Sequence, residues 1–410
     1  MRISCPPQPS DHSVCRTRGV RSVPAMVAPD IICACHTASY TVMRLLRVPF
    51  LRLLVAFHRM RHPGQLLSLE EWKAQGSKPK SILVFSNTAL GDTLLSTPAL
   101  CALRQCYPDA HITLFLHKNL MPLFRDHPCA DELIPFHGGF RRFFRTLEAL
   151  RQAQPDVALL LHSNAPQDIP MALLSGAHVI LKTATRSPFR HLLSAHFPRQ
   201  EKHEVERRMD LVRALGCSVD TPALQLPQRF RRKPGPGLTI GIQSGAADHY
   251  KVWPEERFAE TILRLSERYP DARFILTGSP EERAACDRIR MASIPERVEN
   301  LCGKTSLEQL VEVVAGLDLL ITNDTGTLHV AAALDVPTLA LFSPTSCLEF
   351  GAWGPSRLHH VIQKPPPDDL KLPKKQRSNA GMQQISVDEV VSEARTLLHN
   401  TSGKSDKLPF

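Results

Sequence analysis

Short apolar runs alternate with amphipathic segments along most of this chain. The first apolar run spans residues 81–85, a helical pattern follows at 94–106, and the next apolar run lies at 111–117. Apolar runs separated by helical segments are typical of βαβ units, in which the strands pair in parallel. We therefore expect an α/β protein built on parallel sheets.

This alternation occurs twice, on either side of a basic segment rich in Pro and Gly at 229–237. In the first half a further strand is expected at 157–161 and a further helix at 204–215. In the second half strands are expected at 238–242, 273–276, 318–321 and 338–342, and helices at 255–269, 281–291, 306–315 and 327–334. Because Pro and Gly break regular structure, the chain is predicted to divide into an α/β domain at 80–228, a linker at 229–237, a second α/β domain at 238–385, and a C-terminal helix and tail at 386–410.

The chain before residue 80 does not share this pattern. Residues 1–42 have neither helical nor strand periodicity and lack the long apolar stretch of a secretory signal, so we expect disorder there. Met26 and Met43 leave open a start of translation further along the chain.

Residues 43–79 form a basic segment whose first part is amphipathic. Arg44, Arg47, Arg52 and Arg59 fall within roughly 140° of a helical wheel, and Pro49 would begin or interrupt the helix. Such a helix suits the surface of a membrane. It equally suits docking on the protein core with the Arg side chains at the rim, so both interpretations stay open.

The distribution of charge separates this basic leader from the rest of the chain. Of the 410 residues, 43% are apolar and 22% are charged, and no uncharged apolar run reaches the ~18 residues of a spanning helix. Residues 1–80 hold 12 Lys or Arg and 4 Asp or Glu, hence +8 of the net charge of +10. The nearly neutral remainder argues against a nucleic-acid-binding protein and indicates a leader that meets an anionic partner.

The cysteines show no spacing typical of a metal site or a redox motif. No two of them form a CxxC pair, so we expect reduced thiols in a cytosol-like compartment. Cys33, Cys35 and His36 could form half of a metal clip, but no second pair faces them, and we expect no metal site. The eleven are Cys5, Cys15, Cys33, Cys35, Cys101, Cys106, Cys129, Cys217, Cys286, Cys302 and Cys347.

The candidate chemistry lies in loops that follow strands, where ligands bind in open α/β sheets. The loop 87–92 follows the first strand and ends in a carboxylate, Asp92, which could otherwise cap the next helix. The chain has no GxGxxG motif, which weighs against an enzyme that uses a nicotinamide or flavin.

Two loops of the second half suit a phosphate group. The loop 243–255 has small residues that let the backbone approach a ligand, and its Lys251 can reach an anion or remain a solvated charge. In the loop 323–329 the backbone N–H groups of Thr325, Gly326 and Thr327 would emerge from a helix N-terminus and could hold a diphosphate.

Two further carboxylates lie in these loops. Asp324 would cap the helix that follows it or bind a sugar hydroxyl, because it does not suit an anion. Glu281 follows another strand and could accept hydrogen bonds from ribose hydroxyls. A nucleotide-sugar bound by the second domain, with an acceptor on the first, fits these loops together.

Four blocks of sequence carry a resemblance to a known family. They read ILVFSNTALGDTLLSTPALCALRQCYPDAHITLF, HEVERRMDLVRALG, IGIQSGAADHYKVWPEERFAE, and NDTGTLHVAAALDVPTLALFSPTS followed by WGP. From about residue 80 to about residue 398 the chain resembles glycosyltransferase family 9, the heptosyltransferases of the lipopolysaccharide inner core. The resemblance implies a GT-B fold, in which two Rossmann-like domains face a central cleft.

The resemblance also implies roles for individual residues. Asp92 is the implied general base, Lys251 contacts the donor phosphate, and Glu281 meets the nucleoside. The turn formed by Asp324, Thr325 and Gly326 holds the donor diphosphate and sugar. The predicted donor site is completed by Ser244, Thr327 and His329. The family often has His-Pro-Gly-Ala where this chain has Gln243-Ser-Gly-Ala246, so the contact at Gln243 departs from the pattern.

The implied reaction is the inverting transfer of a sugar, with heptose from ADP-heptose as the expected donor and a lipopolysaccharide inner-core saccharide as acceptor. Neither a cofactor nor a metal is expected, because the chain has no Asp-x-Asp motif and Cys33, Cys35 and His36 have no second pair to complete a metal site. The competing function is a GT-B transferase or epimerase that acts on a different nucleotide-sugar in cell-surface polysaccharide synthesis. A non-enzymatic scaffold is disfavoured, since it need keep neither Asp92 nor Lys251.

The acceptor and the location of the protein are predicted from the basic residues. Arg141, Arg142 and Arg145 could pair with an anionic lipid-linked saccharide, or form a solvated helix face. We expect the protein on the cytoplasmic face of a bacterial inner membrane, held peripherally at an anionic surface through residues 43–62. No nucleic-acid partner is expected.

Overall fold

The computed structural model describes residues 46–402. The expected disorder at 1–42 and the Cys33, Cys35 and His36 cluster lie outside this range. No helix among the described residues is long and apolar enough to cross a membrane.

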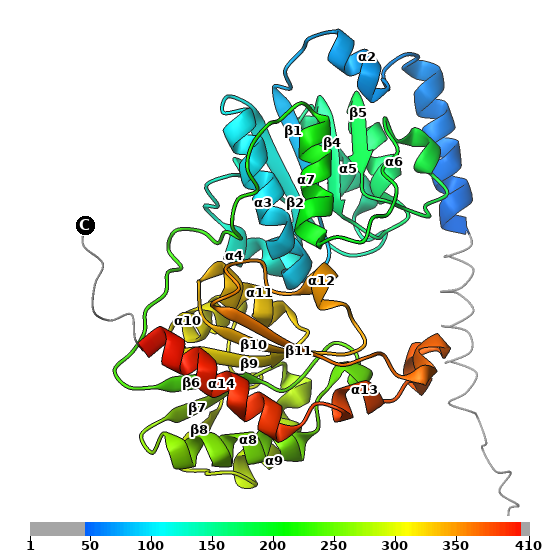
Figure 1. Cartoon of the computed structure of the whole chain (residues 1–410). Helices are drawn as coiled ribbons and strands as arrows, with labels where there is room; N and C mark the ends of the chain where they lie inside the picture. Colours follow the sequence, from blue (N-terminus) through cyan, green and yellow to red (C-terminus); the bar gives the residue numbers. More distant parts are fainter. Residues whose placement is uncertain (1–45, 403–410) are drawn as a thin grey trace, which may run out of the picture. The chain divides into compact units, whose positions relative to one another are not determined.

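The first sheet has five parallel strands in the order β3-β2-β1-β4-β5 (Figure 1). Helices α3 and α7 cover one face of this sheet, and α5 and α6 cover the other. The strands are β1 (Ser81–Ser86), β2 (His111–His117), β3 (Glu132–Phe136), β4 (Val157–His162) and β5 (Val179–Lys182). The helices are α2 (Leu69–Ala74), α3 (Leu90–Cys106), α4 (Met121–Phe124), α5 (Phe143–Gln152), α6 (Asp168–Leu174) and α7 (Glu204–Ala214).

The second sheet has six parallel strands in the order β11-β10-β9-β6-β7-β8. Helices α8, α9 and α14 lie on one face, and α10 and α11 on the other (Figure 1). The strands are β6 (Thr239–Gln243), β7 (Arg273–Thr277), β8 (Val298–Asn300), β9 (Leu319–Asn323), β10 (Thr338–Phe342) and β11 (His359–Gln363). The helices are α8 (Glu255–Arg268), α9 (Arg283–Met291), α10 (Leu307–Ala315), α11 (Gly326–Ala333), α12 (Cys347–Phe350), α13 (Ala380–Gln383) and α14 (Val387–Ser402).

Both sheets reverse their strand order at one point, between β1 and β4 in the first and between β6 and β9 in the second. The strands there are buried along their whole length except for the end of β4, as the apolar runs of the sequence predict. In open α/β sheets, ligands bind where the strand order reverses, beyond the carboxyl ends of the strands. Of the loops predicted to carry chemistry, those after β1, β6 and β9 lie at the two reversal points, and the loop with Glu281 follows β7, the neighbour of β6.

Helix α3 begins earlier than the predicted 94–106. It starts at Leu90, after an N-cap residue, Ala89, that makes no side-chain capping bond. Asp92 therefore lies inside the first turn, and the alternative in which Asp92 caps the helix is wrong. Its carboxylate is free of the helix backbone and lies near the helix N-terminus, where the macrodipole favours negative charge.

The expectation that all the cysteines are reduced is wrong for four of them. Disulfides join Cys101 to Cys129 and Cys106 to Cys217, with Cα–Cα distances of 5.1 and 5.7 Å. Cys101 and Cys106 lie on α3, and their partners lie in loops that the fold brings beside this helix. Since 28 and 111 positions separate the partners, the linear spacing gives no sign of either pair.

The amphipathic N-terminal helix has features of both a helix docked on the core and a helix on a membrane surface. Residues 46–61 are helical, and Pro49 lies within them. Leu51 and Val55 are buried, as expected of a helix docked on the core. Leu53, Phe57 and Met60 form a stripe at helical spacing that is 72%, 50% and 73% exposed. The helix therefore docks with one face and presents a second apolar face to solvent.

Candidate active site

The N-termini of α3 and α11 meet at two glycines. A Cβ atom on Gly91 would lie 2.8 Å from Cδ2 of His329 and 3.3 Å from Cα of Gly326. A side chain on Gly91 would therefore force the two helices apart. The glycines allow a loop that follows β1 of one sheet to contact the loop that follows β9 of the other.

A cavity of 990 Å³ opens at this contact and is lined from both sheets. Gln243, Phe350 and Leu90 also contribute to its wall. Eight residues predicted for the site line it: Asp92, Lys251, Glu281, Asp324, Thr325, Gly326, Thr327 and His329.

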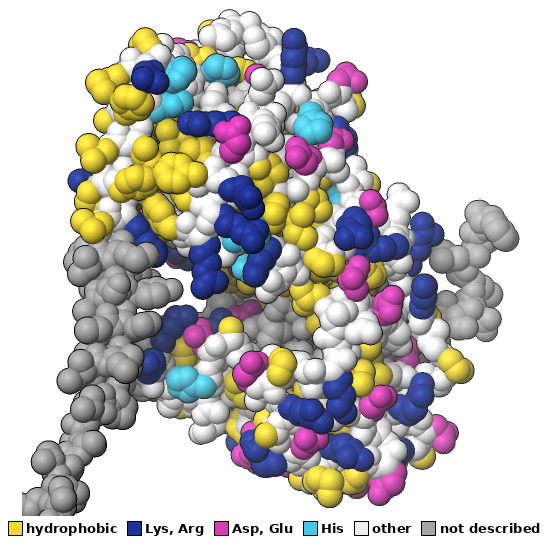
Figure 2. Space-filling view, turned by 180° about the vertical axis from the view of Figure 1, so that it is seen from behind, with side chains coloured by type: hydrophobic (Ala, Val, Ile, Leu, Met, Phe, Trp, Pro, Cys, Tyr) yellow, Lys and Arg dark blue, Asp and Glu magenta, His cyan; other side chains and the backbone are white. Residues whose placement is uncertain are grey.

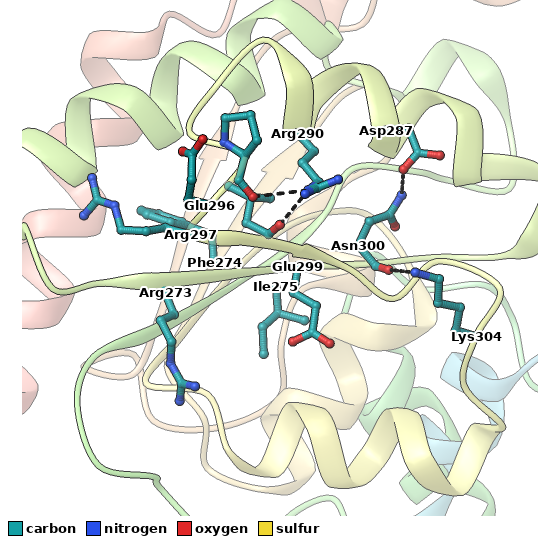
Figure 3. Close-up of a pocket in the computed structure, with 12 residues that line it drawn as sticks. Arg273, Phe274, Ile275, Asp287, Arg290, Glu296, Arg297, Glu299, Asn300 and Lys304 are labelled. Atoms are coloured by element: carbon teal, nitrogen blue, oxygen red, sulfur yellow. Dashed lines mark hydrogen bonds between the residues drawn. The ribbon is translucent and has the colours of Figure 1, made fainter.

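A second hollow, of 670 Å³, lies against β7 and β8 at the edge of the second sheet (Figure 3). Several of its polar side chains bond to one another or to the local backbone. Nε of Arg290 donates to the carbonyl of Val298 at 3.0 Å, Nδ2 of Asn300 donates to Asp287 at 2.7 Å, and Lys304 donates to the carbonyl of Asn300 at 2.7 Å. We therefore assign the candidate site to the cavity between the two sheets, where the sequence motifs converge.

Asp92 is surrounded by three polar side chains that the sequence analysis did not single out. Its Oδ1 lies 3.3 Å from Nε2 of His162 and 3.6 Å from Nη2 of Arg208. Its Oδ2 lies 3.3 Å from the hydroxyl of Thr88. The Asp92 side chain keeps 24% of its surface exposed, so it remains open to a substrate.

Arg208 is fully buried and holds the first turn of α3 in place. It donates to the backbone carbonyl of Asp92 at 2.6 Å and to the hydroxyl of Ser96 at 3.0 Å. Burial lowers the pKa of Arg208, while Glu204 at 3.4 Å and Asp92 oppose this shift. A guanidinium remains charged in proteins, so two carboxylates balance this buried cation. In the sequence, Glu204 and Arg208 are four positions apart on a predicted helix, and this spacing could have indicated the ion pair between them.

Lys251 and Asp324 form an ion pair on the other side of the cavity. Nζ of Lys251 lies 2.7 Å from Oδ2 of Asp324, and the two side chains are 20% and 12% exposed. Lys251 is therefore not the solvated charge of the alternative interpretation. Asp324 does not cap the helix, because the N-cap of α11 is Thr325. The carboxylate instead fixes the direction in which the ammonium points.

Helix α11 presents its N-terminus to the cavity. No side chain caps it, so its first backbone N–H groups and its dipole are available to an anion. Asn323 ties this turn to the loop after β6 by donating to the carbonyls of Ser244 and Gly245 at 2.7 and 3.3 Å. The two loops predicted to bind phosphate, 243–255 and 323–329, are therefore held together by these hydrogen bonds.

Three other predicted donor residues occupy different environments. His329 is buried, which lowers its pKa to about 4, and its Nδ1 has no hydrogen-bond partner among the described residues. Glu281 is exposed, and hydrogen bonds from its own backbone N–H and from Ser279 lower its pKa. Ser244 is buried behind the loop, with its hydroxyl 3.3 Å from Sγ of Cys286, and it does not line the cavity. The donor contact of Ser244 stays a prediction.

The three arginines predicted to bind acceptor do not line the cavity. Arg141 and Arg142 lie in the exposed loop after β3, and Arg145 lies in the first turn of α5, so the alternative of a helix face applies to Arg145 alone. Nη1 of Arg142 lies 3.4 Å from Nε2 of His137. Because the loop follows the carboxyl end of β3, it lies along the same sheet edge as Asp92.

Two parallel sheets, each with its reversal point at a shared cavity, define an α/β protein of the GT-B type. Residues 144–377 match glycosyltransferase family 9 (heptosyltransferase), and the chain belongs to this family. It is therefore a glycosyltransferase of the heptosyltransferase family.

Relatives in several bacteria agree with this membership. The chain is 25% identical over 336 residues to lipooligosaccharide heptosyltransferase 2 of Campylobacter jejuni, covering 78% of this chain and 99% of that one. It is 30% identical over 303 residues to lipopolysaccharide heptosyltransferase 2 of Salmonella typhimurium, covering 65% and 83%.

Solved structures agree on the fold. The structure of E. coli ADP-heptose lps heptosyltransferase II matches with a TM-score of 0.65 at 25% identity, covering 78% of this chain and 99% of that one. E. coli heptosyltransferase WaaC with ADP matches with a TM-score of 0.63 at 21% identity, covering 77% and 99%. The predicted GT-B fold is confirmed.

Proposed function

We propose that this protein transfers heptose from ADP-heptose to a saccharide of the lipopolysaccharide inner core, with inversion at the anomeric carbon. The observation that carries the proposal is that Asp92, Lys251 and the N-terminus of α11 all line one cavity. The first group suits an acceptor hydroxyl and the others suit a diphosphate.

The reaction needs one base and stabilisation of one leaving group. Asp92 takes the proton of the acceptor hydroxyl as the hydroxyl oxygen attacks the anomeric carbon. The new carbon–oxygen bond forms on the face opposite the diphosphate, and the bond to the diphosphate breaks with its electron pair, releasing ADP. Lys251 and the N–H groups at Gly326 and Thr327 offset the charge that develops on the leaving oxygen.

The donor is proposed from the family and from the site. ADP is the nucleotide named for WaaC, a solved structure with the same fold. Glu281 lines the cavity, and its carboxylate suits hydrogen bonds from ribose hydroxyls. Calorimetry with ADP-heptose, UDP-glucose and GDP-mannose tests this choice. We expect the ADP-sugar to bind at least about tenfold more tightly than the others, a difference of about 1.4 kcal/mol. Tighter binding of a UDP- or GDP-sugar would support the alternative, a GT-B enzyme of a different nucleotide-sugar.

The proposed acceptor is an anionic, lipid-linked saccharide. Arg141, Arg142 and Arg145 remain the candidates for its carboxylates or phosphates, because a guanidinium pairs with both through two parallel hydrogen bonds. Their loop follows the strand two places from β1 in the sheet, so a saccharide of several units could span from these arginines to Asp92.

We also propose that the protein rests on the cytoplasmic face of the inner membrane. The exposed stripe of Leu53, Phe57 and Met60 lies on a helix that also exposes Arg52 and Arg59. Hydrophobic and Lys or Arg side chains gather beside one another on the face shown in Figure 2. Apolar side chains that enter the headgroup region beside basic ones are typical of helices lying on anionic membranes.

Sedimentation with anionic vesicles tests the membrane contact. The full chain should pellet with phosphatidylglycerol vesicles at low salt, and binding should weaken as salt rises, because each basic residue near the surface contributes about 1 kcal/mol and is screened. Replacing Leu53, Phe57 and Met60 together by Ser should reduce the bound fraction at least about tenfold, since burial of one such side chain contributes about 1.5 to 3 kcal/mol.

The matched control is Met291→Ser, which changes an exposed apolar residue of α9. Equal binding of the triple variant and the control would remove this helix from the membrane contact.

A further inference from the structure

Asp92 contacts two side chains that also contact each other, Thr88 and His162. Neither the motifs nor the family resemblance assigned a role to these two residues. Nε2 of His162, at the end of β4, lies 3.3 Å from Oδ1 of Asp92. Nδ1 of the same ring lies 2.6 Å from the hydroxyl of Thr88, and that hydroxyl lies 3.3 Å from Oδ2 of Asp92. Thr88, His162 and Asp92 therefore form a triangle of polar contacts.

The hydroxyl proton of Thr88 and the single ring proton of His162 determine which group in the triangle is the donor in each contact. The hydroxyl of Thr88 has one proton, which can go to His162 or to Asp92 but not to both. If it went to Asp92, Nδ1 of His162 would carry the ring proton, and the bare Nε2 would face the negative Oδ1. If it goes to His162, over the shorter distance of 2.6 Å, Nε2 carries the ring proton and lies 3.3 Å from Oδ1. Only the second arrangement avoids placing a bare ring nitrogen against Oδ1 of an ionised Asp92.

Burial, together with the charges around it, keeps the ring of His162 neutral. Burial first, and then Arg208, lower the pKa of His162 to about 3, with Lys182 adding to the shift and Glu204 opposing it. At neutral pH the ring has a single N–H group and no net charge, so the 3.3 Å approach of Nε2 to Oδ1 of Asp92 is a polar contact rather than an ion pair. A neutral donor orients a carboxylate without bringing a proton that could neutralise it.

We propose that His162, with its tautomer set by Thr88, is a positioning residue that holds Oδ1 of Asp92 and leaves Oδ2 as the oxygen that receives the acceptor proton. This inference rests on the proposed role of Asp92 as the base. Arg208 fixes the backbone of the same residue through its carbonyl at 2.6 Å. The backbone and one carboxylate oxygen are thus held, and the proton moves from the acceptor hydroxyl to the oxygen that makes no bond to the ring.

The test compares two replacements of His162, one without an N–H donor and one that keeps an N–H donor. In His162→Leu the N–H group is lost, and kcat should fall about 10²-fold, the cost of misplacing a catalytic group by about 1 Å. The KM for acceptor and the calorimetric affinity for ADP-heptose should stay within about threefold, because His162 contacts neither in this account. His162→Gln restores an N–H near the Nε2 position and should recover kcat to within about fivefold of wild type. Turnover is measured with ADP-heptose and lipopolysaccharide from a heptose-deficient strain.

A second pair of variants tests the tautomer and guards against misfolding at position 162. Thr88→Val removes the hydroxyl at nearly constant volume and should lower kcat about tenfold, while Thr88→Ser keeps the hydroxyl and should lose no more than about threefold. Equal kcat values in His162→Leu and His162→Gln, or in Thr88→Val and Thr88→Ser, would overturn the inference. Asp92→Asn, assayed in parallel, separates the two levels of the account. An active Asp92→Asn would reject the base itself, whereas an inactive Asp92→Asn beside a fully active His162→Leu would reject the positioning role alone.

Discussion

The Asp92→Asn variant is expected to lose transfer activity by about 10² to 10⁴-fold while its affinity for ADP-heptose stays within a few-fold of wild type. The amide keeps the shape of the side chain, and Arg208 still donates to the backbone carbonyl at position 92, so the first turn of α3 stays in place. It cannot take up the acceptor proton, however, and this step belongs to the acceptor and not to donor binding. Turnover by mass spectrometry and donor binding by calorimetry measure the two effects separately.

The matched control for this variant is Asp109→Asn. Asp109 is an exposed carboxylate just before β2, at the opposite edge of the same sheet. The control should keep full turnover and full donor affinity. If Asp92→Asn keeps turnover within threefold of this control, Asp92 is not the base.

The Lys251→Ala variant is expected to bind ADP-heptose about 10 to 150-fold more weakly, the value of a charge-assisted contact of roughly 1.5 to 3 kcal/mol. Removing the ammonium also leaves the carboxylate of Asp324 unpaired beside the position proposed for the diphosphate. Two anionic groups would then face each other, which adds repulsion to the lost contact. Titration of ADP into the variant measures the change without an acceptor.

The ion pair provides an internal check on this prediction. In the double variant Lys251→Ala with Asp324→Asn, the repulsion is removed, so ADP affinity should recover in part. The control Lys73→Ala changes an exposed lysine on α2 and should bind ADP normally. If Lys251→Ala binds ADP as tightly as this control does, Lys251 does not contact the donor phosphate.

The buried strands were predictable because their apolar runs are continuous. The run at 81–85 became β1, and the run at 338–342 became β10. The four edge strands, β3, β5, β8 and β11, were missed. Strand β3 contains Pro135 and is only partly buried, β8 has three residues with Glu299 at its centre, β5 has only four residues, and β11 is only partly buried. Edge strands such as these have one open side and so need no continuous apolar run.

The site was predictable where its residues lie close together in the sequence. The loop containing Lys251 and the turn at Asp324 each directly follow a strand, so the topology alone places both of them at the reversal point of the second sheet. The partners of Asp92 could not be found in this way. His162 lies on β4, and the pairing of β4 with β1 brings it to the carboxylate. Arg208 is 116 positions away on α7, and the packing of α7 on α3 brings it there.

The central claim, inverting transfer of heptose from ADP-heptose, is tested most directly by the product. The purified protein is incubated with ADP-heptose and lipopolysaccharide from a heptose-deficient strain, and the new linkage is examined by NMR while released ADP is quantified. The account predicts one ADP released for each heptose transferred, and an anomeric configuration opposite to that of the donor. Retention of the donor configuration, or no transfer from ADP-heptose while another nucleotide-sugar is consumed, would contradict it.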